Sequence, residues 1–383
     1  MLAIEAVNVR HMPYRWLGSR ARGKAYKACG THPLVVRRRR DAVGGLELTA
    51  VGVIVADIIA ADLPKVASPG ELVVLPRTVE LHVGGHPANI TIDLVNLGQR
   101  GESLKAVGAV GEDVFGNFVL NTLSSKGIRT AISRYKVGTT KNVVLVVKGE
   151  DRRFHVEPGA SWELKADEVI AALEEEPPRI FYVVSGMCRE VDNRIAEIMG
   201  RASDLGCITF LDVITALGID WSFVRNALKY SDIFHCNAFE MLNLTNSVDF
   251  EASIERMLEL GVKLMFLTDG EKGAYAIDRE KTVSQPAFRV ESIDPTGAGD
   301  AFCAGIMDTF FRRGVGKNDV SRLPAEQVVE ILEMAQAAGA ACVTAIGTTT
   351  GVTAERVARI IASQGEEIKR GTRVSFRTKR VRD

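Results

Sequence analysis

Residues 292–307, SIDPTGAGDAFCAGIM, join a glycine-rich loop and an aspartate to the start of an apolar helical pattern. Glycines at 297 and 299 permit a turn with positive φ and let a ligand approach the backbone closely. We predict that the helix begins at about Asp300, and a helix N-terminus offers free N–H groups and partial positive charge to an anion. The segment is therefore suited to hold a phosphate, or the charge that develops on one during its transfer.

Asp300 itself has two interpretations. As an N-terminal carboxylate it would only cap the helix, a contribution of about 0.5–2 kcal/mol, and for the isolated stretch this is the simpler one. As a general base it would take a proton from a substrate hydroxyl while the loop amides stabilise the moving phosphoryl group. The loop lacks the lysine and spacing of a P-loop, and it lies late in the chain, unlike the fingerprint on the first strand of a dinucleotide-binding fold.

The elements around this loop alternate between strands and helices. The run 47–59 is continuously apolar and rich in β-branched residues, which predicts one buried strand. Residues 84–98, GGHPANITIDLVNLG, predict a helix after a Gly-Gly turn. Further strand-then-helix units predict an open, mainly parallel sheet with helices on both faces. The last helices are expected at 300–313, about 325–346 and about 353–364.

Some strand-rich pieces do not follow this alternation. Residues 140–160 and 273–288 each alternate around a turn, which predicts two β-hairpins. The pieces 60–83 and 138–158 are expected to form a small extra sheet beside the main one. Such a sheet exposes its edges, and exposed edges often pair between subunits, so a homodimer is expected there.

The charge of the chain is balanced overall but unevenly placed. The 383 residues are 46% hydrophobic and carry a formal net charge of zero, enough apolar sequence for one large domain or two smaller ones. Residues 1–45 carry 10 Lys/Arg against 2 Asp/Glu, and residues 369–383 carry 7 against 1, so the two ends hold +8 and +6 and the body −14. We interpret 1–45 as a disordered basic extension, or equally as a stretch upstream of the true start, and 369–383 as a basic tail.

Several classes of protein are disfavoured. The six cysteines are scattered without a C-x-x-C pair, which removes support for zinc and redox motifs and is typical of a reducing cytosol, so a cytoplasmic location is expected. No run of 18 apolar residues predicts a membrane span, and the N-terminus lacks a signal-peptide pattern. Zero net charge argues against a nucleic-acid binder, although the basic ends leave a nucleic-acid arm as a weaker alternative.

Two stretches together resemble a known family. DPTGAGDAFCAGIM resembles the second signature of the PfkB, or ribokinase-like, carbohydrate kinases, and GGHPANITIDLVNLG followed by Gly108 resembles the first. The segments at 106–128, 237–240 and 267–275 continue the pattern, and the resemblance covers roughly residues 48–364. It implies a three-layer α/β/α sandwich with a mainly parallel central sheet and a small β lid, formed by a kinase domain at 46–368.

The resemblance also implies roles for individual residues. Asp300 would be the catalytic base, and the backbone amides of Gly297, Ala298 and Gly299 would form an anion hole. The acceptor would be held by Asp57, Gly84, Gly85 and Asn89. ATP would be held by Asn237, Thr268, Gly270 and Gly273. Two acids are assigned to metals: Glu240 to Mg²⁺, and Asp294 to the neighbourhood of a monovalent cation such as K⁺.

Simpler interpretations exist for most of these positions when each is taken alone. The Gly-Gly pair could be a turn, Asn89 a satisfied polar residue, Glu240 a solvated acid at a helix start and Asp57 a loop cap. The histidines at 82, 86 and 235 show no metal spacing and receive no role.

Three functions follow as hypotheses. The first is an ATP-dependent kinase that phosphorylates a hydroxymethyl group of a sugar or sugar derivative. The second is a nucleoside kinase of the same fold, and the third is a non-catalytic ligand sensor with nucleic-acid-binding basic ends. Residues 210–218 lack the Asp-x-Asn-x-Arg run of many sugar-specific members, and residues 340–352 lack their Arg and Gly-Ala pair, so the acceptor and the adenine pocket stay open.

Overall fold

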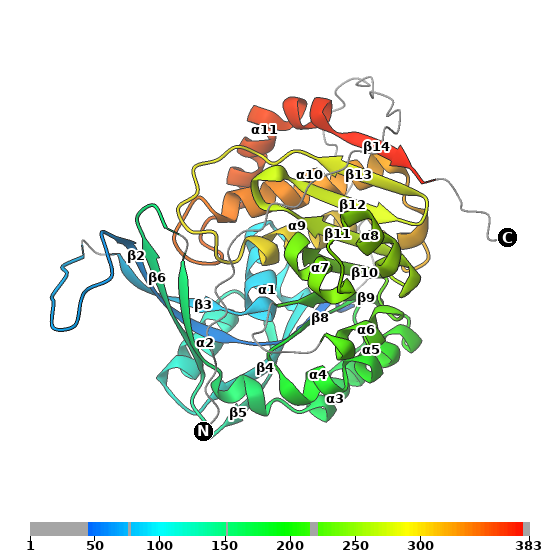
Figure 1. The fold of residues 1–383 in the computed structure, drawn as a ribbon. Coiled ribbons are helices and arrows are strands. Elements are labelled where there is room, and N and C mark those ends of the chain that lie inside the picture. Colours follow the sequence, from blue (N-terminus) through cyan, green and yellow to red (C-terminus); the bar gives the residue numbers. More distant parts are fainter. Residues whose placement is uncertain (1–44, 76–77, 151, 215–220, 378–383) are drawn as a thin grey trace.

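The computed structural model describes residues 45–75, 78–150, 152–214 and 221–377. The basic extension expected at the N-terminus lies outside the described residues except for Gly45, and so does the end of the basic tail. Within the described chain, helices cover both faces of a large central sheet, and a smaller sheet stands to one side (Figure 1). The predicted three-layer fold with a mainly parallel sheet is confirmed.

Ten strands form the central sheet. Six neighbouring pairs, from β11 to β5, are parallel, and the last three strands at the other edge are antiparallel. The predicted hairpin at 273–288 is the β12–β13 pair. In spatial order the strands are β14 (Arg373–Phe376), β13 (Lys281–Gln285), β12 (Ala274–Asp278), β11 (Leu264–Thr268), β10 (Ile233–Asn237), β9 (Ile208–Val213), β8 (Ile180–Ser185), β1 (Leu48–Val51), β4 (Leu104–Gly111) and β5 (Arg129–Tyr135).

Helices cover the two faces because the central strands are apolar on both. In β8, Tyr182 packs into the core under one helical layer and Phe181 into the core under the other. The first layer holds α1 (His86–Asn96), α2 (Val114–Ser125), α9 (Ala298–Arg313), α10 (Ala325–Cys342) and α11 (Ala354–Gly371). The second holds α3 (Ala166–Glu175), α4 (Arg189–Asn193), α5 (Ile195–Asp204), α6 (Ser222–Leu228), α7 (Ala238–Thr245) and α8 (Phe250–Glu259).

Short 3₁₀ turns complete the connections: η1 (Gly101–Ser103), η2 (Gly159–Glu163), η3 (Gly270–Lys272) and η4 (Val320–Arg322). Among the described residues, no helix combines the length and the apolar character needed to cross a membrane.

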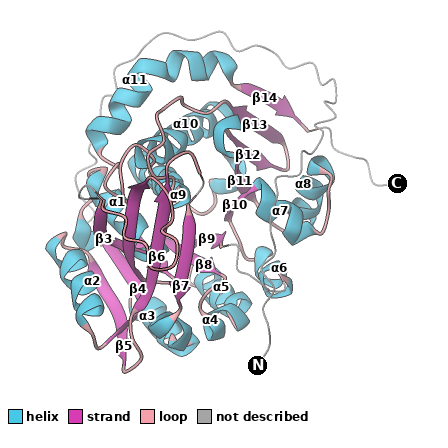
Figure 2. Cartoon of the chain, turned by 60° about the vertical axis from the view of Figure 1, so that its left-hand side comes forward, coloured by secondary structure: helices cyan, strands magenta, loops and turns pink. Residues whose placement is uncertain are grey.

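The smaller sheet, here called the lid, has four strands. Their order is β3 (Val79–Gly84), β2 (Val55–Leu63), β6 (Thr140–Val147) and β7 (Arg153–Glu157), and Figure 2 shows them in front of the main sheet. The predicted hairpin at 140–160 is the β6–β7 pair. The lid begins earlier than the sequence suggested, since β2 already starts at residue 55.

The prediction of one continuous strand over 47–59 was wrong. The chain bends after β1 and enters the lid as β2, so the run serves two sheets. Gly52 lies at the bend, and a Cβ there would lie 2.2 Å from Cγ1 of Val184. Apolar composition alone could not reveal this bend, because both halves are buried.

The C-terminal region is also more ordered than expected. Helix α11 runs to Gly371 instead of 364, and β14 then adds an antiparallel strand to the edge of the sheet at β13. Part of the segment interpreted as a basic tail from 369 therefore belongs to the folded unit.

Candidate active site

The glycine-rich loop leads directly into α9. Gly297 is the N-cap residue, with φ 83° and ψ −1°, and a Cβ there would lie 2.6 Å from the carbonyl oxygen of Thr348. Gly299 lies inside the first turn of the helix and does not have a positive φ. Of the two glycines, only Gly297 has the expected positive φ. The Ala298 N–H donates a 3.4 Å hydrogen bond to the Pro295 carbonyl. The chain thus enters α9 through a tight turn at Gly297.

Asp300 is the third residue of α9 and is 7% exposed. Its Oδ2 accepts a 2.8 Å hydrogen bond from Nδ2 of Asn89, and its Oδ1 has no hydrogen-bond partner among the described residues. No side chain caps α9, so the carboxylate does not perform the simple capping role. Burial raises the pKa of Asp300, and the nearby His86 and the bond from Asn89 partly oppose that rise.

Asn89 links the two signature segments. It lies on α1, 211 positions before Asp300, and its Oδ1 accepts a 2.8 Å hydrogen bond from the Thr348 hydroxyl. The same hydroxyl also lies 3.0 Å from the Val83 carbonyl oxygen. Both ends of the Asn89 amide are therefore engaged within the protein. Nothing in the sequence around Thr348 marked it as part of this site.

Asp57 reaches the site from the lid. It lies on β2 and is 3% exposed, and its Oδ1 accepts a 2.9 Å hydrogen bond from Asn142 on β6. Burial raises its pKa to about 6. The Gly-Gly pair makes room for this arrangement: a Cβ on Gly84 would lie 1.7 Å from Oδ2 of Asp57, and one on Gly85 would lie 2.2 Å from the Val53 carbonyl oxygen.

The residues assigned to ATP lie at the carboxyl ends of two neighbouring strands. Asn237 of β10 and Thr268 of β11 are register partners in the central sheet. Gly270 and Gly273 then form the tight turn into β12, with φ of 55° and 108°. The carboxyl ends of parallel strands are the usual ligand edge of an open α/β sheet.

Glu240 stabilises the N-terminus of α7 at this edge of the sheet. Its Oε2 accepts a 2.8 Å hydrogen bond from the Asn237 N–H, while Asn237 Oδ1 accepts one of 2.9 Å from the Glu240 N–H. This capping box explains the N-x-x-E spacing without a ligand. The carboxylate is nevertheless held at a fixed place at the strand ends, where one acid and several waters suffice for Mg²⁺.

Asp294 stabilises the glycine-rich loop through two hydrogen bonds. It is fully buried; its Oδ1 accepts a 3.0 Å hydrogen bond from the Thr296 N–H, and its Oδ2 accepts one of 3.0 Å from the Gly347 N–H. These bonds tie the glycine loop to the segment that carries Thr348. Each oxygen keeps a further lone pair, so a cation nearby is compatible with this geometry.

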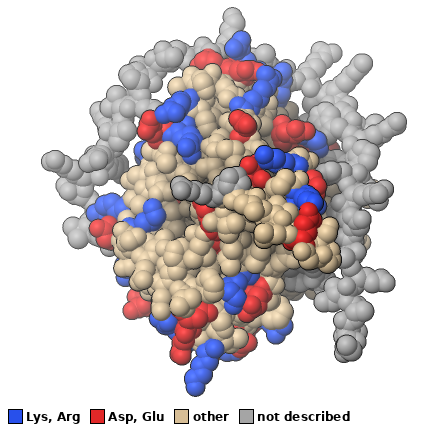
Figure 3. Space-filling model, turned by 90° about the vertical axis from the view of Figure 1, so that its left-hand side faces the viewer, with Lys and Arg blue, Asp and Glu red and all other residues tan. Residues whose placement is uncertain are grey.

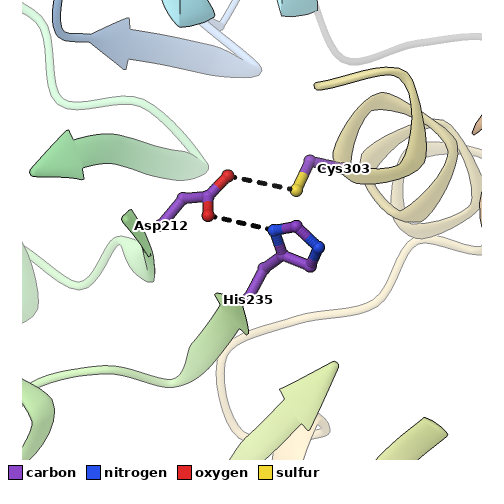
Figure 4. Close-up of side chains that lie close together, drawn as sticks. All are labelled: Asp212, His235 and Cys303. Carbon is purple, nitrogen blue, oxygen red and sulfur yellow. Dashed lines mark hydrogen bonds and ion pairs between the residues drawn. The ribbon is translucent and has the colours of Figure 1, made fainter. Parts of the chain in front are cut away.

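A buried cluster that sequence analysis missed lies beneath the loop (Figure 4). Nδ1 of His235 lies 2.9 Å from Oδ1 of Asp212, while Oδ2 accepts hydrogen bonds from the Tyr182 hydroxyl at 2.8 Å and the Cys303 thiol at 3.5 Å. Burial alone would raise the pKa of Asp212 and lower that of His235, but their mutual attraction reverses both shifts. A Cβ on Gly299 would lie 3.6 Å from Cε1 of His235, so the imidazole ring lies directly under the loop.

Asp212, His235 and Cys303 also offer ligand atoms within 4.8 Å of one another. The hydrogen bonds already satisfy the Asp212 carboxylate, and burial raises the pKa of the Cys303 thiol well above its usual value. The geometry therefore fits an ion pair with supporting donors better than a metal site.

The site residues fall into two groups. The acceptor group comes from the lid, α1 and α9, and its acids lie close enough to perturb one another, since both Asp294 and Asp300 raise the pKa of Asp57. The second group lines the ends of β10 and β11. In Figure 1 the lid strand β3 lies next to α1, and α9 is drawn on the other side of α1 from the lid. The arrangement can hold a hydroxyl compound on one side of the helix start and an anion on the other.

Comparison with known proteins gives a consistent result. The profile of the pfkB family of carbohydrate kinases matches residues 46–355. Fructokinase-2 of Zea mays is 27% identical over 278 residues, which cover 69% of this chain and 80% of the relative. The crystal structure of fructokinase with bound ATP from Xylella fastidiosa is 25% identical, with a TM-score of 0.69 over 83% of this chain and 99% of that one. The structure of ribokinase from Giardia lamblia shares the fold, with a TM-score of 0.71 at 18% identity over 84% of this chain and 99% of that one.

Proposed function

The chain belongs to the pfkB family of carbohydrate kinases, and on that premise we propose that it transfers a phosphoryl group from ATP to a hydroxymethyl group of a sugar or sugar derivative, with Asp300 as the general base. One observation carries the proposal. Asp300 presents a buried oxygen that has no hydrogen-bond partner among the described residues at the start of a helix, while its other oxygen is fixed by Asn89 from the other signature.

The raised pKa of Asp300 suits this role. A general base works best when its pKa lies near the working pH, and burial moves this carboxyl in that direction. Asn89 orients the carboxylate so that Oδ1 faces the acceptor. The hydroxyl gives its proton to Oδ1 as its oxygen attacks the γ-phosphorus in line.

The start of α9 supplies the stabilisation of charge. The N–H groups of Gly297 and Gly299 at the helix N-terminus would face the transferring phosphoryl group, together with the partial positive charge of the helix end. Because the loop is braced by Asp294 and Thr348, these groups need little reorganisation during the reaction.

ATP would lie along the ends of β10 and β11, against Asn237, Thr268, Gly270 and Gly273. Glu240 would hold Mg²⁺ through water, and Mg²⁺ bound with the nucleotide would neutralise phosphate charge. Asp294 would lie beside a monovalent cation such as K⁺ and contribute its remaining lone pairs.

The acceptor is proposed to be a polyhydroxy compound such as a sugar. Asp57, Asn142 and His82 are register partners on adjacent lid strands, so they share one face of the lid. A carboxylate, an amide and an imidazole side by side match several hydroxyl groups of a sugar ring.

Protonation of Asp57 is expected to weaken acceptor binding at low pH. Its raised pKa of about 6 means that the carboxylate loses its charge as the pH falls through that value, so kcat/KM for the acceptor should decline below about pH 6. Asp57→Asn should raise KM about tenfold, the cost of one charged hydrogen bond, and should remove the decline of kcat/KM that sets in below about pH 6. If Asp57→Asn left both KM and the pH dependence of kcat/KM unchanged, Asp57 would not belong to the acceptor site.

The function is tested by ATP consumption against a panel of sugars, sugar acids, sugar phosphates and nucleosides, with Asp300→Asn as the blank. Turnover of a sugar by the full chain, lost in the blank, is the expected result. A nucleoside as the best acceptor would favour the second hypothesis. Salt-dependent nucleic-acid binding by the full chain but not by residues 46–383, without turnover of any compound, would favour the sensor.

We also propose that two copies associate through the outer face of the lid. Asp57 faces the site, so its neighbour Ile58 points outward together with its register partners Leu81 and Val143. Leu81 and Val143 are 43% and 38% exposed, and Val79 nearby is 58% exposed. Figure 3 looks at this side of the molecule and shows a broad area without charged side chains, bordered by acidic and basic ones. A second lid offers the matching apolar surface.

Leu81→Lys is expected to convert the dimer to a monomer in light scattering after size exclusion, since it buries a charge at the proposed interface. Val248→Lys is the matched control, because Val248 is 93% exposed on the loop between α7 and α8. A monomeric wild-type chain at micromolar concentration would contradict the proposal.

A further inference from the structure

His86 lies beside Asp300, a contact that no local sequence pattern predicts. It is the first residue of α1, directly after the Gly-Gly pair, and its side chain is 18% exposed. Its Nε2 lies 3.7 Å from Oδ1 of Asp300, beyond the range of a direct hydrogen bond. Its Nδ1 is buried and has no hydrogen-bond partner among the described residues.

The two oxygens of Asp300 are not equivalent. Oδ2 is held by Asn89, whereas Oδ1 is buried and has no partner in the described part of the chain. The closest ionisable group to Oδ1 that the structure records is the His86 imidazole. Buried polar atoms are rarely left without partners, so an orphan acceptor and an imidazole 3.7 Å apart point to a ligand group that contacts both.

A hydroxyl oxygen satisfies that geometry. Hydrogen bonds of about 2.8 Å from one oxygen can reach two atoms that are 3.7 Å apart. The hydroxyl would donate to Oδ1 and accept from Nε2–H, which leaves one lone pair free. His86 lies on α1 and Asp300 on α9, and these two helices pack against each other, so the protein sets the direction of that lone pair.

Resting on the proposed function, we propose that His86 is a second catalytic residue, whose Nε2–H binds the acceptor hydroxyl and orients it for attack. The hydroxyl O–H bond breaks and its proton passes to Oδ1 of Asp300. The free lone pair forms the new O–P bond, the bond between the γ-phosphorus and the bridging oxygen breaks, and its electrons remain on ADP. His86 neither gains nor loses a proton, and it contributes by fixing the angle of approach.

Three substitutions separate this role from packing. His86→Ala removes the donor and is expected to lower kcat about 10- to 100-fold, the scale of a lost orienting contact. His86→Gln places an amide N–H near the position of Nε2 and should restore kcat to within about fivefold of wild type. His86→Asn places its amide near Nδ1 instead and should not restore it. Thermal unfolding and binding of a non-hydrolysable ATP analogue check that each variant is folded.

The outcomes distinguish this inference from the proposed function. A wild-type chain that phosphorylates no acceptor would overturn both. Turnover by wild type with an unchanged kcat in His86→Ala would overturn the role of His86 alone. Equal losses in the Gln and Asn variants would assign His86 to packing of the helix start and would also overturn it.

Discussion

Replacement of Asp300 by Asn is expected to lower kcat by about 10²- to 10⁴-fold, the range that a positioned general base contributes. The amide keeps the shape of the carboxylate, and its oxygen can still accept the hydrogen bond from Asn89. It cannot take the proton of the acceptor hydroxyl. Steady-state ATP consumption at saturating acceptor measures the loss, and KM for each substrate should change much less than kcat.

Asp308→Asn is the matched control for this variant. Asp308 is fully buried on the same helix, and its carboxylate accepts 2.7 Å hydrogen bonds from Gln99 and Arg312. Its replacement should lower the free energy of unfolding by about 1–3 kcal/mol through weakened charged hydrogen bonds, and should leave kcat within a few fold. Asp300→Asn with wild-type turnover would remove Asp300 as the base.

Gly297→Ala is expected to lower kcat by about 10²- to 10³-fold, comparable to the loss of one donor from an oxyanion hole. Gly297 has φ 83°, and an added Cβ would lie 2.6 Å from the backbone oxygen of Thr348, which cannot yield as a flexible side chain would. Because the Thr348 hydroxyl contacts Asn89, the displacement would also disturb the partner of the base.

The other end of α9 supplies the control for Gly297. Gly314 is the C-cap, with φ 66°, and apart from its chain neighbours no atom of the described residues lies within 4 Å of the position of its Cβ. Gly314→Ala should therefore cost only the backbone strain, about 1–2 kcal/mol in the free energy of unfolding, with kcat retained. If Gly297→Ala and Gly314→Ala were equally active, the position of the glycine loop would not matter and the proposed anion hole would be wrong.

The acceptor side shows where local sequence was informative and where it was not. Gly84 and Asp57 were each predicted to contact the acceptor, but the reason for the glycine is the carboxylate itself, which occupies the space of a Cβ. Asn89 was assigned to the acceptor, which stays a prediction, and its amide also contacts Asp300 and Thr348. We therefore propose that it orients the base, and that Asp57 makes the acceptor contact.

The charge beneath the loop was not predictable from local patterns. Asp212 and His235 lie in apolar runs that predict buried strands, and each residue alone has many structural interpretations. Their register on β9 and β10 brings the two strand ends together, and the ion pair then compensates the burial of both charges. His86 and Thr348 escaped notice for the same reason, since their partners lie more than 200 positions away.

The sequence by itself determined the fold class and identified the glycine loop, the aspartate and the first signature, because periodicity and turn residues act over a few positions. Only the tertiary structure decided that the run 47–59 divides between two sheets, because the deciding contact at Gly52 comes from Val184. It also decided which oxygen of Asp300 is free. Asn89 binds one oxygen of Asp300 and His86 lies near the other, and both residues are on α1, far away in the chain. The packing of α1 against α9 therefore decides which oxygen is free, and the residue types alone do not.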